Sequence, residues 1–134
     1  MVGFKESRSM GETAQISANS NYKNTIHTMK RLIGLSFTSP RAQAEMKRAP
    51  FKCLPNKHSS GGPDSIAVSV QLNNEEVMLP IEAAAGMLIK HTWGIVAETS
   101  AETANSDKVD SFPTDWDIAI PGFYTDADAY THLR

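Results

Sequence analysis

Residues Asn24–Gly34 read Asn-Thr-Ile-His-Thr-Met-Lys-Arg-Leu-Ile-Gly, and this stretch decides how we expect the chain to fold. Three apolar residues recur at helical spacing and predict one buried stripe: Ile26, Met29 and Ile33. An asparagine before the stripe, Asn24 or Asn21, can accept a hydrogen bond from the first turn, and Gly34 suits the left-handed residue that ends a helix. The stretch therefore predicts a short amphipathic helix.

A basic pair, Lys30 and Arg31, falls in the last turn of this predicted helix. The simplest interpretation is that the two cations complement the negative end of the helix dipole. Because the helix would be anchored by its buried stripe, Lys30 and Arg31 would be held more firmly than on a flexible loop.

Composition indicates one globular domain, with 134 residues of which 40% are hydrophobic and 21% charged. A net charge of −2 and a pI near 6.1 give no electrostatic reason to expect nucleic acid or an anionic membrane as partner. The chain shows neither an apolar run of the roughly 20 residues that a membrane span needs nor a secretory signal. A lone Cys53 fits a reducing compartment, so we expect a cytoplasmic protein, or one that is also nuclear.

The rest of the chain predicts alternating short strands and helices, which is an α/β pattern. Strands are expected at Val2–Lys5, Arg8–Met10, Phe51–Leu54, Ile66–Leu72, Glu75–Leu79 and Trp116–Ile120. Helices are expected at Glu12–Ser20, from Arg41 to Arg48 behind Pro40, for roughly 20 residues after Pro80, and after Asp126. The long helix after Pro80 has an apolar stripe of Ile81, Ala84, Ala85, Leu88, Ile95 and Val96. Asn73-Asn74 suits a tight hairpin turn, and Asn56–Asp64 is expected to be a loop. Ala101–Thr114 is expected to be a linker or a frayed helix end.

Patterns typical of self-contained catalytic or metal sites do not occur in the sequence. The four histidines include no pair at the spacing of a zinc helix, and Cys53 has no second cysteine. There is no glycine-rich phosphate loop and no Gly-x-Ser-x-Gly motif. Asp126 and Asp128 are two residues apart, so on a helix they would not face each other. We therefore predict no metal site.

The opening stretch resembles the segment Asn-Thr-Val-x-x-x-Lys-Arg-Leu-Ile-Gly of the 70-kDa heat-shock chaperone superfamily. Upstream, Gly11–Ala14 resembles the family's Gly-Asp/Glu-x-Ala, and downstream Glu45–Phe51 is similar to Asp-Met-Lys-x-x-Pro-Phe. The hairpin, the Pro-x-Glu helix start at Pro80, and Ile118–Tyr124 follow in family order. These segments follow one order along nearly the whole chain, which makes a specific match.

Within the superfamily, two stretches resemble the 110-kDa branch, whose large members act as nucleotide exchange factors. These are Phe-Tyr-Thr-Asp-Ala at Phe123–Ala127 and Lys-Asn-Thr at Lys23–Thr25. Glu45–Phe51 is closer to ordinary 70-kDa members. We favour the 110-kDa branch.

The resemblance implies an actin-like, ribonuclease H-like ATPase fold in which residues 1–134 form a partial nucleotide-binding domain. This part would be lobe I, mainly subdomain IB with some of IA, and incomplete at both ends. ATP with magnesium is the cofactor that the resemblance implies for the intact family. Lys30 matches the catalytic lysine at the transferred phosphate, a role that suits a compact ammonium charge. Arg31 matches an arginine facing the nucleotide cleft, and Pro121 matches a switch proline that relays nucleotide state to the substrate domain.

The sequence also departs from the family pattern. It contains neither the Asp-Leu-Gly phosphate hairpin with the magnesium-positioning Asp, nor the second phosphate loop, the adenosine site or lobe II. Ala129 stands where the family has an arginine eight residues after the switch proline. Phosphoryl transfer needs metal, both loops and positioning together, so we expect this chain alone to be inactive and to be a truncated product.

Two classes of function follow from the resemblance. The first is an ATP-binding chaperone or exchange factor of the stress response, partnered by a 70-kDa heat-shock chaperone and, through other domains, by unfolded protein clients. The second is a non-catalytic interaction piece that contacts such a chaperone without nucleotide. A third alternative is a gene product without stable fold or function, because unpaired strand edges favour aggregation.

Overall fold

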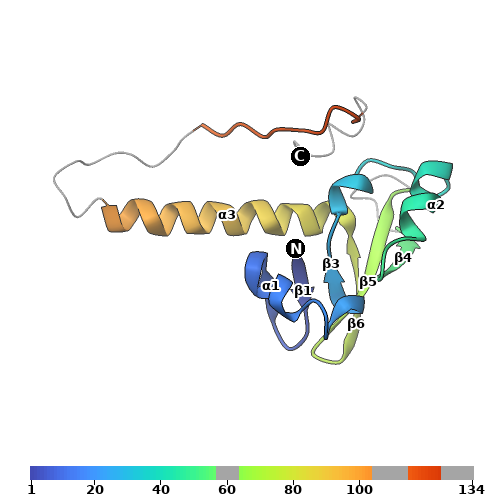
Figure 1. Cartoon of the computed structure of the whole chain (residues 1–134), viewed down its shortest axis with the longest axis horizontal. Helices are drawn as coiled ribbons and strands as arrows, with labels where there is room; N and C mark the ends of the chain where they lie inside the picture. Colours follow the sequence, from blue (N-terminus) through green and yellow to red (C-terminus); the bar gives the residue numbers. More distant parts are fainter. Residues whose placement is uncertain (57–63, 104–114, 125–134) are drawn as a thin grey trace.

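The computed structural model describes residues 1–56, 64–103 and 115–124, and it confirms a mixed α/β chain (Figure 1). Its strands are β1 (Val2–Phe4), β2 (Arg8–Met10), β3 (Thr25–Ile26), β4 (Lys52–Pro55), β5 (Ile66–Leu72) and β6 (Glu75–Pro80). Its α-helices are α1 (Gly11–Ser17), α2 (Pro40–Met46) and α3 (Ile81–Thr103), and its 3-10 helices are η1 (Tyr22–Asn24) and η2 (Met29–Arg31). None of the helices in these ranges is long and apolar enough to cross a membrane.

The strands form two small antiparallel sheets, with the orders β2-β1-β3 and β4-β5-β6. In the first sheet, Val2 of β1 pairs with Met10 on one side and with Ile26 on the other. In the second sheet, β5 and β6 form the predicted hairpin, whose turn residues Asn73 and Asn74 have positive φ angles of 53° and 65°. The structure therefore confirms the strands predicted near the N-terminus and in the hairpin.

The two predicted helices that begin at prolines are also confirmed. Ser39 precedes α2, and its side-chain oxygen accepts a hydrogen bond from the Ala42 backbone N–H at 3.2 Å, while Pro40 takes the first helical position. The long helix α3 runs for 23 residues behind Pro80 and ends at Thr103, so it includes the first three residues of the segment predicted as a linker or a frayed helix end. The other residues predicted as loop or linker, 57–63 and 104–114, and the helix predicted after Asp126 lie outside the described residues.

The prediction of a helix over Asn24–Gly34 is wrong. Thr25 and Ile26 form β3, Thr28 is left-handed with a φ of 52°, and only η2 is helical. Two causes favour the strand: Ile26 gains a partner in β1, and the stretch is rich in β-branched residues, which are restricted in helices. Gly34 does adopt the expected left-handed conformation, with a φ of 74°.

The asparagines expected to cap that helix join separate strands instead. The Asn21 side-chain amide donates to the Phe4 carbonyl at 2.7 Å. The Asn24 side-chain oxygen accepts from the Gln71 backbone N–H at 3.0 Å, which links η1 to β5. Side chains that could have capped a helix locally are therefore used in tertiary contacts.

The prediction of a strand at Trp116–Ile120 is wrong as well. This segment runs along α3 and pairs with none of the described strands (Figure 1). The backbone groups of a helix interior already bond to one another, so α3 offers the segment no ladder of hydrogen bonds. Its alternating apolar side chains stay 39% to 47% exposed: Trp116, Ile118 and Ile120.

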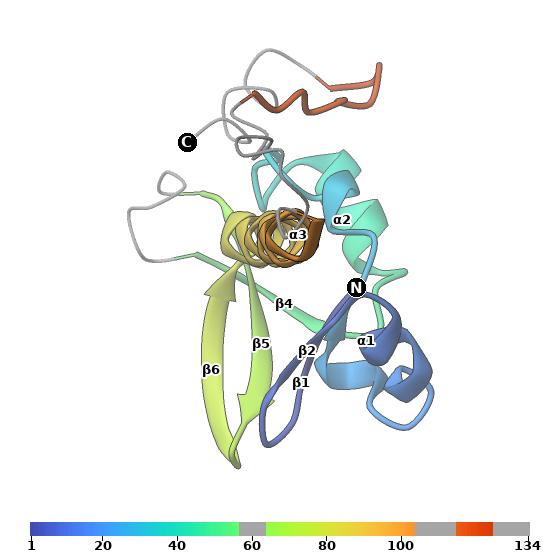
Figure 2. The same ribbon diagram turned by 90° about the vertical axis from the view of Figure 1, so that its left-hand side faces the viewer.

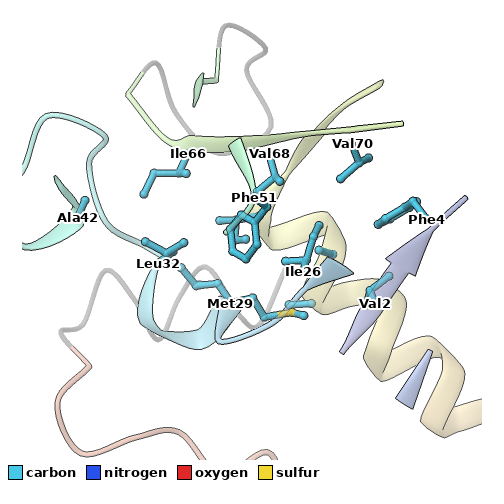
Figure 3. Close-up of a cluster of buried hydrophobic side chains, with 14 residues drawn as sticks. Val2, Phe4, Ile26, Met29, Leu32, Ala42, Phe51, Ile66, Val68 and Val70 are labelled. Carbon is cyan, nitrogen blue, oxygen red and sulfur yellow. The ribbon is translucent and has the colours of Figure 1, made fainter. Parts of the chain in front are cut away.

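The core lies between the two sheets, η2 and the beginning of α3. Figure 2 shows α3 end-on, above the strands. Figure 3 shows side chains of β5 directed toward Phe51 and toward residues of β3 and η2. The core members that are fully buried and largest are Ile26, Ile66, Ile81, Val2, Val68 and Val70. Each such side chain contributes about 1.5–3 kcal/mol through removal from water. The apolar stripe expected for Asn24–Gly34 is thus buried, although the backbone that carries it is not a helix.

Only the first half of α3 joins this core. Ile81, Ala84 and Ala85 are buried, whereas Ile95 further along is 50% exposed. The C-terminal half of the helix projects beyond both sheets (Figure 1). The helix predicted from apolar spacing is therefore confirmed. The burial of its apolar stripe is confirmed only for the first half.

Candidate functional site

The 3-10 helix η2 positions the basic pair that the sequence singles out. The Arg31 N–H donates to the Thr28 carbonyl at 3.0 Å, and the Leu32 N–H donates to the Met29 carbonyl at 2.9 Å. Met29, Leu32 and Ile33 are buried on the core side of this turn. Lys30 and Arg31 are left exposed on its outer side. Apolar anchors on both sides of the pair therefore fix the backbone from which the two cations project.

The bend before η2 is centred on Thr28. A positive φ is rare for a β-branched residue, because its side chain crowds the backbone. The Thr28 hydroxyl lies 3.2 Å from Nδ1 of His27, within hydrogen-bonding distance. The His27 ring in turn packs edge-on against the buried Phe51, with 5.7 Å between ring centroids. Local contacts thus brace the bend that turns Lys30 outward.

The turn Pro121–Tyr124 lies against η2. The Tyr124 N–H donates to the Pro121 carbonyl at 3.0 Å, and the Tyr124 hydroxyl donates to the Lys30 carbonyl at 2.7 Å. The three residues singled out by the resemblance are consequently brought to one surface: Lys30, Arg31 and Pro121. Sequence patterns gave no indication of the tyrosine contact, because its partners are 94 residues apart.

A hollow of about 430 Å³ lies beside Lys30. Its lining residues are Met1, His27, Thr28, Met29, Lys30, Ile33, Ala85, Leu88, Ile89 and Ile118. Aliphatic side chains form most of this wall, so the hollow favours apolar material next to one cation.

Arg31 lines a second, smaller pocket of about 210 Å³ together with Arg41, Glu45 and Phe123. Glu45 lies between two arginines, with its oxygens 3.5 Å from Nη1 of Arg31 and 3.5 Å from Nη1 of Arg48. The guanidinium carbon of Arg41 stands 5.2 Å from the centre of the Phe123 ring. Exposed ion pairs of this kind stabilise a fold by about 0–1 kcal/mol each. The pocket thus combines two arginines, one carboxylate and one aromatic ring.

Titratable groups elsewhere serve structural roles. Burial raises the pKa of the Cys53 thiol to about 11, so this cysteine is protonated at neutral pH and is a poor nucleophile. Hydrogen bonds from the Ser36 and Thr38 hydroxyls lower the pKa of Asp64, which fastens the loop before α2. Among the residues that the structure describes, no three His, Cys, Asp or Glu side chains gather as metal ligands.

The described residues fit ATP with magnesium only in part. The exposed ammonium of Lys30 suits a phosphate oxygen. The hollow beside it is mainly apolar, however, and the described part of the chain brings no carboxylate cluster to the lysine for a metal ion. This surface can therefore contribute one phosphate-facing cation.

Three further residues of this surface were not singled out from the sequence as functional: Arg41, Phe123 and Tyr124. Arg41 lies in a helix that the pattern marks only as short and polar. Phe123 and Tyr124 come after a segment mistaken for a strand. Their contacts join residues far apart in the chain, so no periodicity could reveal them.

Comparison with known proteins defines the class of this α/β chain. The family model described as "Hsp70 protein" matches residues 1–132. The chain is 34% identical over 134 residues to "Heat shock 70 kDa protein 16" of Arabidopsis thaliana, an alignment that covers 99% of this chain. It is 33% identical over 121 residues to "Heat shock 70 kDa protein 4L" of Homo sapiens, covering 90% of the chain. The chain therefore belongs to the Hsp70 family of heat-shock chaperones.

A third relative bears on the branch. "Heat shock protein 110" of Caenorhabditis elegans is 32% identical over 122 residues, which is 89% of this chain. This relative agrees with the 110-kDa branch predicted from the sequence. The chain spans only 16%, 13% and 14% of the lengths of the Arabidopsis, human and nematode relatives.

Proposed function

We propose that this chain forms part of lobe I of an actin-like ATPase domain, mainly subdomain IB, in a chaperone of the 110-kDa branch. Lys30 faces the phosphates of ATP bound with magnesium, and Arg31 faces the nucleotide cleft. The observation that carries this proposal is the display of Lys30 on η2. Its carbonyl is held by Tyr124, its neighbours Met29 and Ile33 are buried, and its ammonium is exposed. A fixed backbone with an exposed charge is what positioning a phosphate requires.

The turn at Pro121 supports a switch role on the same grounds. One hydrogen bond, from the Tyr124 hydroxyl to the Lys30 carbonyl, connects this turn directly to the backbone of the lysine. A displacement of η2 by nucleotide would alter that bond, and a displacement of the turn would alter the lysine. Pro121 is thus well placed to relay nucleotide state.

Family membership supports a proposal about the partner of the whole protein. We propose that the whole protein promotes nucleotide exchange on a 70-kDa heat-shock chaperone, either in the cytoplasm alone or in the cytoplasm and the nucleus. Unfolded protein clients would bind to parts of the protein other than this chain.

The test is a chimera in which residues 1–134 replace the matching segment of the Arabidopsis relative. Lys30→Ala in this chimera should lower ATP turnover by about 100-fold, the usual cost of removing one charge-stabilising group. Lys23→Ala is the matched control, because Lys23 is exposed and lies over the Tyr22 ring, away from η2. Full turnover in the Lys30→Ala chimera would refute the catalytic role.

The apolar hollow supports a second candidate, an interaction piece that contacts a 70-kDa chaperone without nucleotide. Ile89 and Ile118 line the hollow and are 39% and 44% exposed, which suits burial against another protein. The purified chain should then retain a 70-kDa chaperone in a pull-down without ATP, and Ile118→Asp should abolish this retention. Lack of retention by the unaltered chain would exclude this candidate.

A further inference from the structure

Positive charge is concentrated in one short part of this acidic chain. Residues 30–48 contain five lysines and arginines and a single carboxylate, which gives this stretch a net charge of +4 in a chain of net −2. Arg31 and Arg48 have side chains 54% and 73% exposed, and Arg41 is exposed as well. The stretch therefore presents a basic surface to solvent.

The small pocket described above lies within this basic surface. Its volume of about 210 Å³ is below the roughly 300–1,000 Å³ of typical small-molecule sites. It can accept one side chain more readily than a nucleotide. Phe123, half exposed and 5.2 Å from the Arg41 guanidinium carbon, adds an aromatic surface to the pocket.

The two arginines that line the pocket keep hydrogen-bonding capacity for a ligand. A guanidinium has five N–H donors, and the ion pair of Arg31 engages one nitrogen with one Glu45 oxygen at 3.5 Å. Arg41 is engaged with the face of the Phe123 ring, which leaves its edge available. Two planar donors beside one pocket match the geometry of a carboxylate.

We propose that the pocket of Arg31, Arg41, Glu45 and Phe123 is a docking site for an acidic linear segment of a partner protein. An Asp or Glu side chain of the segment would enter between Arg31 and Arg41. A neighbouring aromatic or aliphatic side chain would pack on Phe123. The pocket is distinct from the hollow at Lys30, since Arg41 and Phe123 do not line that hollow.

Charge complementarity favours a short acidic peptide over nucleic acid. Outside residues 30–48 the chain has a net charge of −6. A polynucleotide continues beyond a patch of this size and would meet that negative charge, whereas a peptide segment can end within the patch.

The test measures fluorescence anisotropy of a labelled peptide of Glu and Asp residues with one central Phe, added to the full chain without nucleotide. Arg41→Glu should weaken binding about tenfold or more, since a charge-assisted hydrogen bond to carboxylate is lost and a repulsion is added. Phe123→Ala should weaken binding of this peptide, and should have no effect on a peptide in which Gly replaces the Phe.

Arg8→Glu is the matched control, because Arg8 is exposed on β2 and this substitution changes the net charge equally. Circular dichroism of each variant shows whether the overall helix content is retained. If Arg41→Glu unfolds the chain, the neutral variant Arg41→Gln replaces it. Equal affinities of the Arg41 and Arg8 variants would overturn the proposal. Tighter binding of a single-stranded oligothymidine than of the acidic peptide would overturn it too.

Discussion

The two halves of α3 share one sequence pattern but lie in different surroundings. In the first half, Ile81, Ala84 and Ala85 pack against the sheets and η2. In the second half, Ile95 continues the stripe and is 50% exposed, and Trp93 near its edge is 42% exposed. Helical periodicity thus identifies which face of a helix is apolar, while the rest of the chain decides whether that face is covered.

The largest expected difference between the halves concerns stability. Ile81→Ala should lower the free energy of unfolding by about 2–5 kcal/mol, because it removes buried methyl groups and leaves a cavity. Ile95→Ala should change it by no more than about 0.5 kcal/mol, as expected for a surface substitution. Urea unfolding followed by circular dichroism measures both. Similar losses in the two variants would mean that the second half is covered in solution.

A smaller effect is expected where the second half does have a neighbour. The Trp93 and Trp116 rings lie 5.2 Å apart, and such pairs contribute about 0.5–1.5 kcal/mol. Trp93→Ala leaves Trp116 as the sole tryptophan, and its emission should shift to the red as the ring loses its partner. Ile95→Ala keeps both rings and should leave the emission unchanged. If the emission maximum of the Trp93→Ala variant equals that of the unaltered chain, this would contradict the packing of residues 115–124 on α3.

The smallest expected effect concerns Glu82 in the first half. Burial raises the pKa of this carboxyl above its usual 4.5, and its Oε2 atom is buried without a hydrogen-bond partner among the described residues. In the native state the Glu82 carboxyl therefore keeps its proton at pH values where the same carboxyl in the unfolded chain has released it. Between the unfolded pKa and the raised native pKa, stability contributed by this group falls as pH rises.

Glu82→Gln removes that titration. Compared with the unaltered chain, this variant should gain stability progressively above pH 4.5, and the gain should be greatest at pH 7. Urea midpoints measured across this range provide the comparison. Glu98→Gln, at an exposed position of the same helix, is the control for removing a surface carboxylate. A gain for Glu82→Gln that does not vary with pH would assign the effect to packing.

Local signals in the sequence were enough to predict most of the fold. Pro40 and Pro80 mark the helix starts, Asn73-Asn74 marks the hairpin turn, and alternation marks β5. The two errors arise where a distant partner decides the outcome. Ile26 becomes a strand residue because β1 pairs with it, and Trp116–Ile120 forms no ladder with the described strands because it lies along a helix.

Only the family resemblance singled out the residues of the candidate site. Charge and spacing alone assign Lys30 and Arg31 to the end of a helix that does not form. Their exposure is explained by the burial of Met29, Leu32 and Ile33 around them. The contacts of Arg41, Phe123 and Tyr124 complete the surface, and they join segments that no local pattern relates.

The hydrogen bond between Tyr124 and Lys30 also has a consequence for the order of events during synthesis. Its two ends are separated by 94 residues. At a translation rate of 5–20 residues per second, the lysine waits about 5–20 s on the ribosome before the tyrosine is made. The sheets can pair during that interval, since their strands lie before Pro80. The surface that presents Lys30 is therefore completed after the sheets, when the turn that carries Tyr124 joins it.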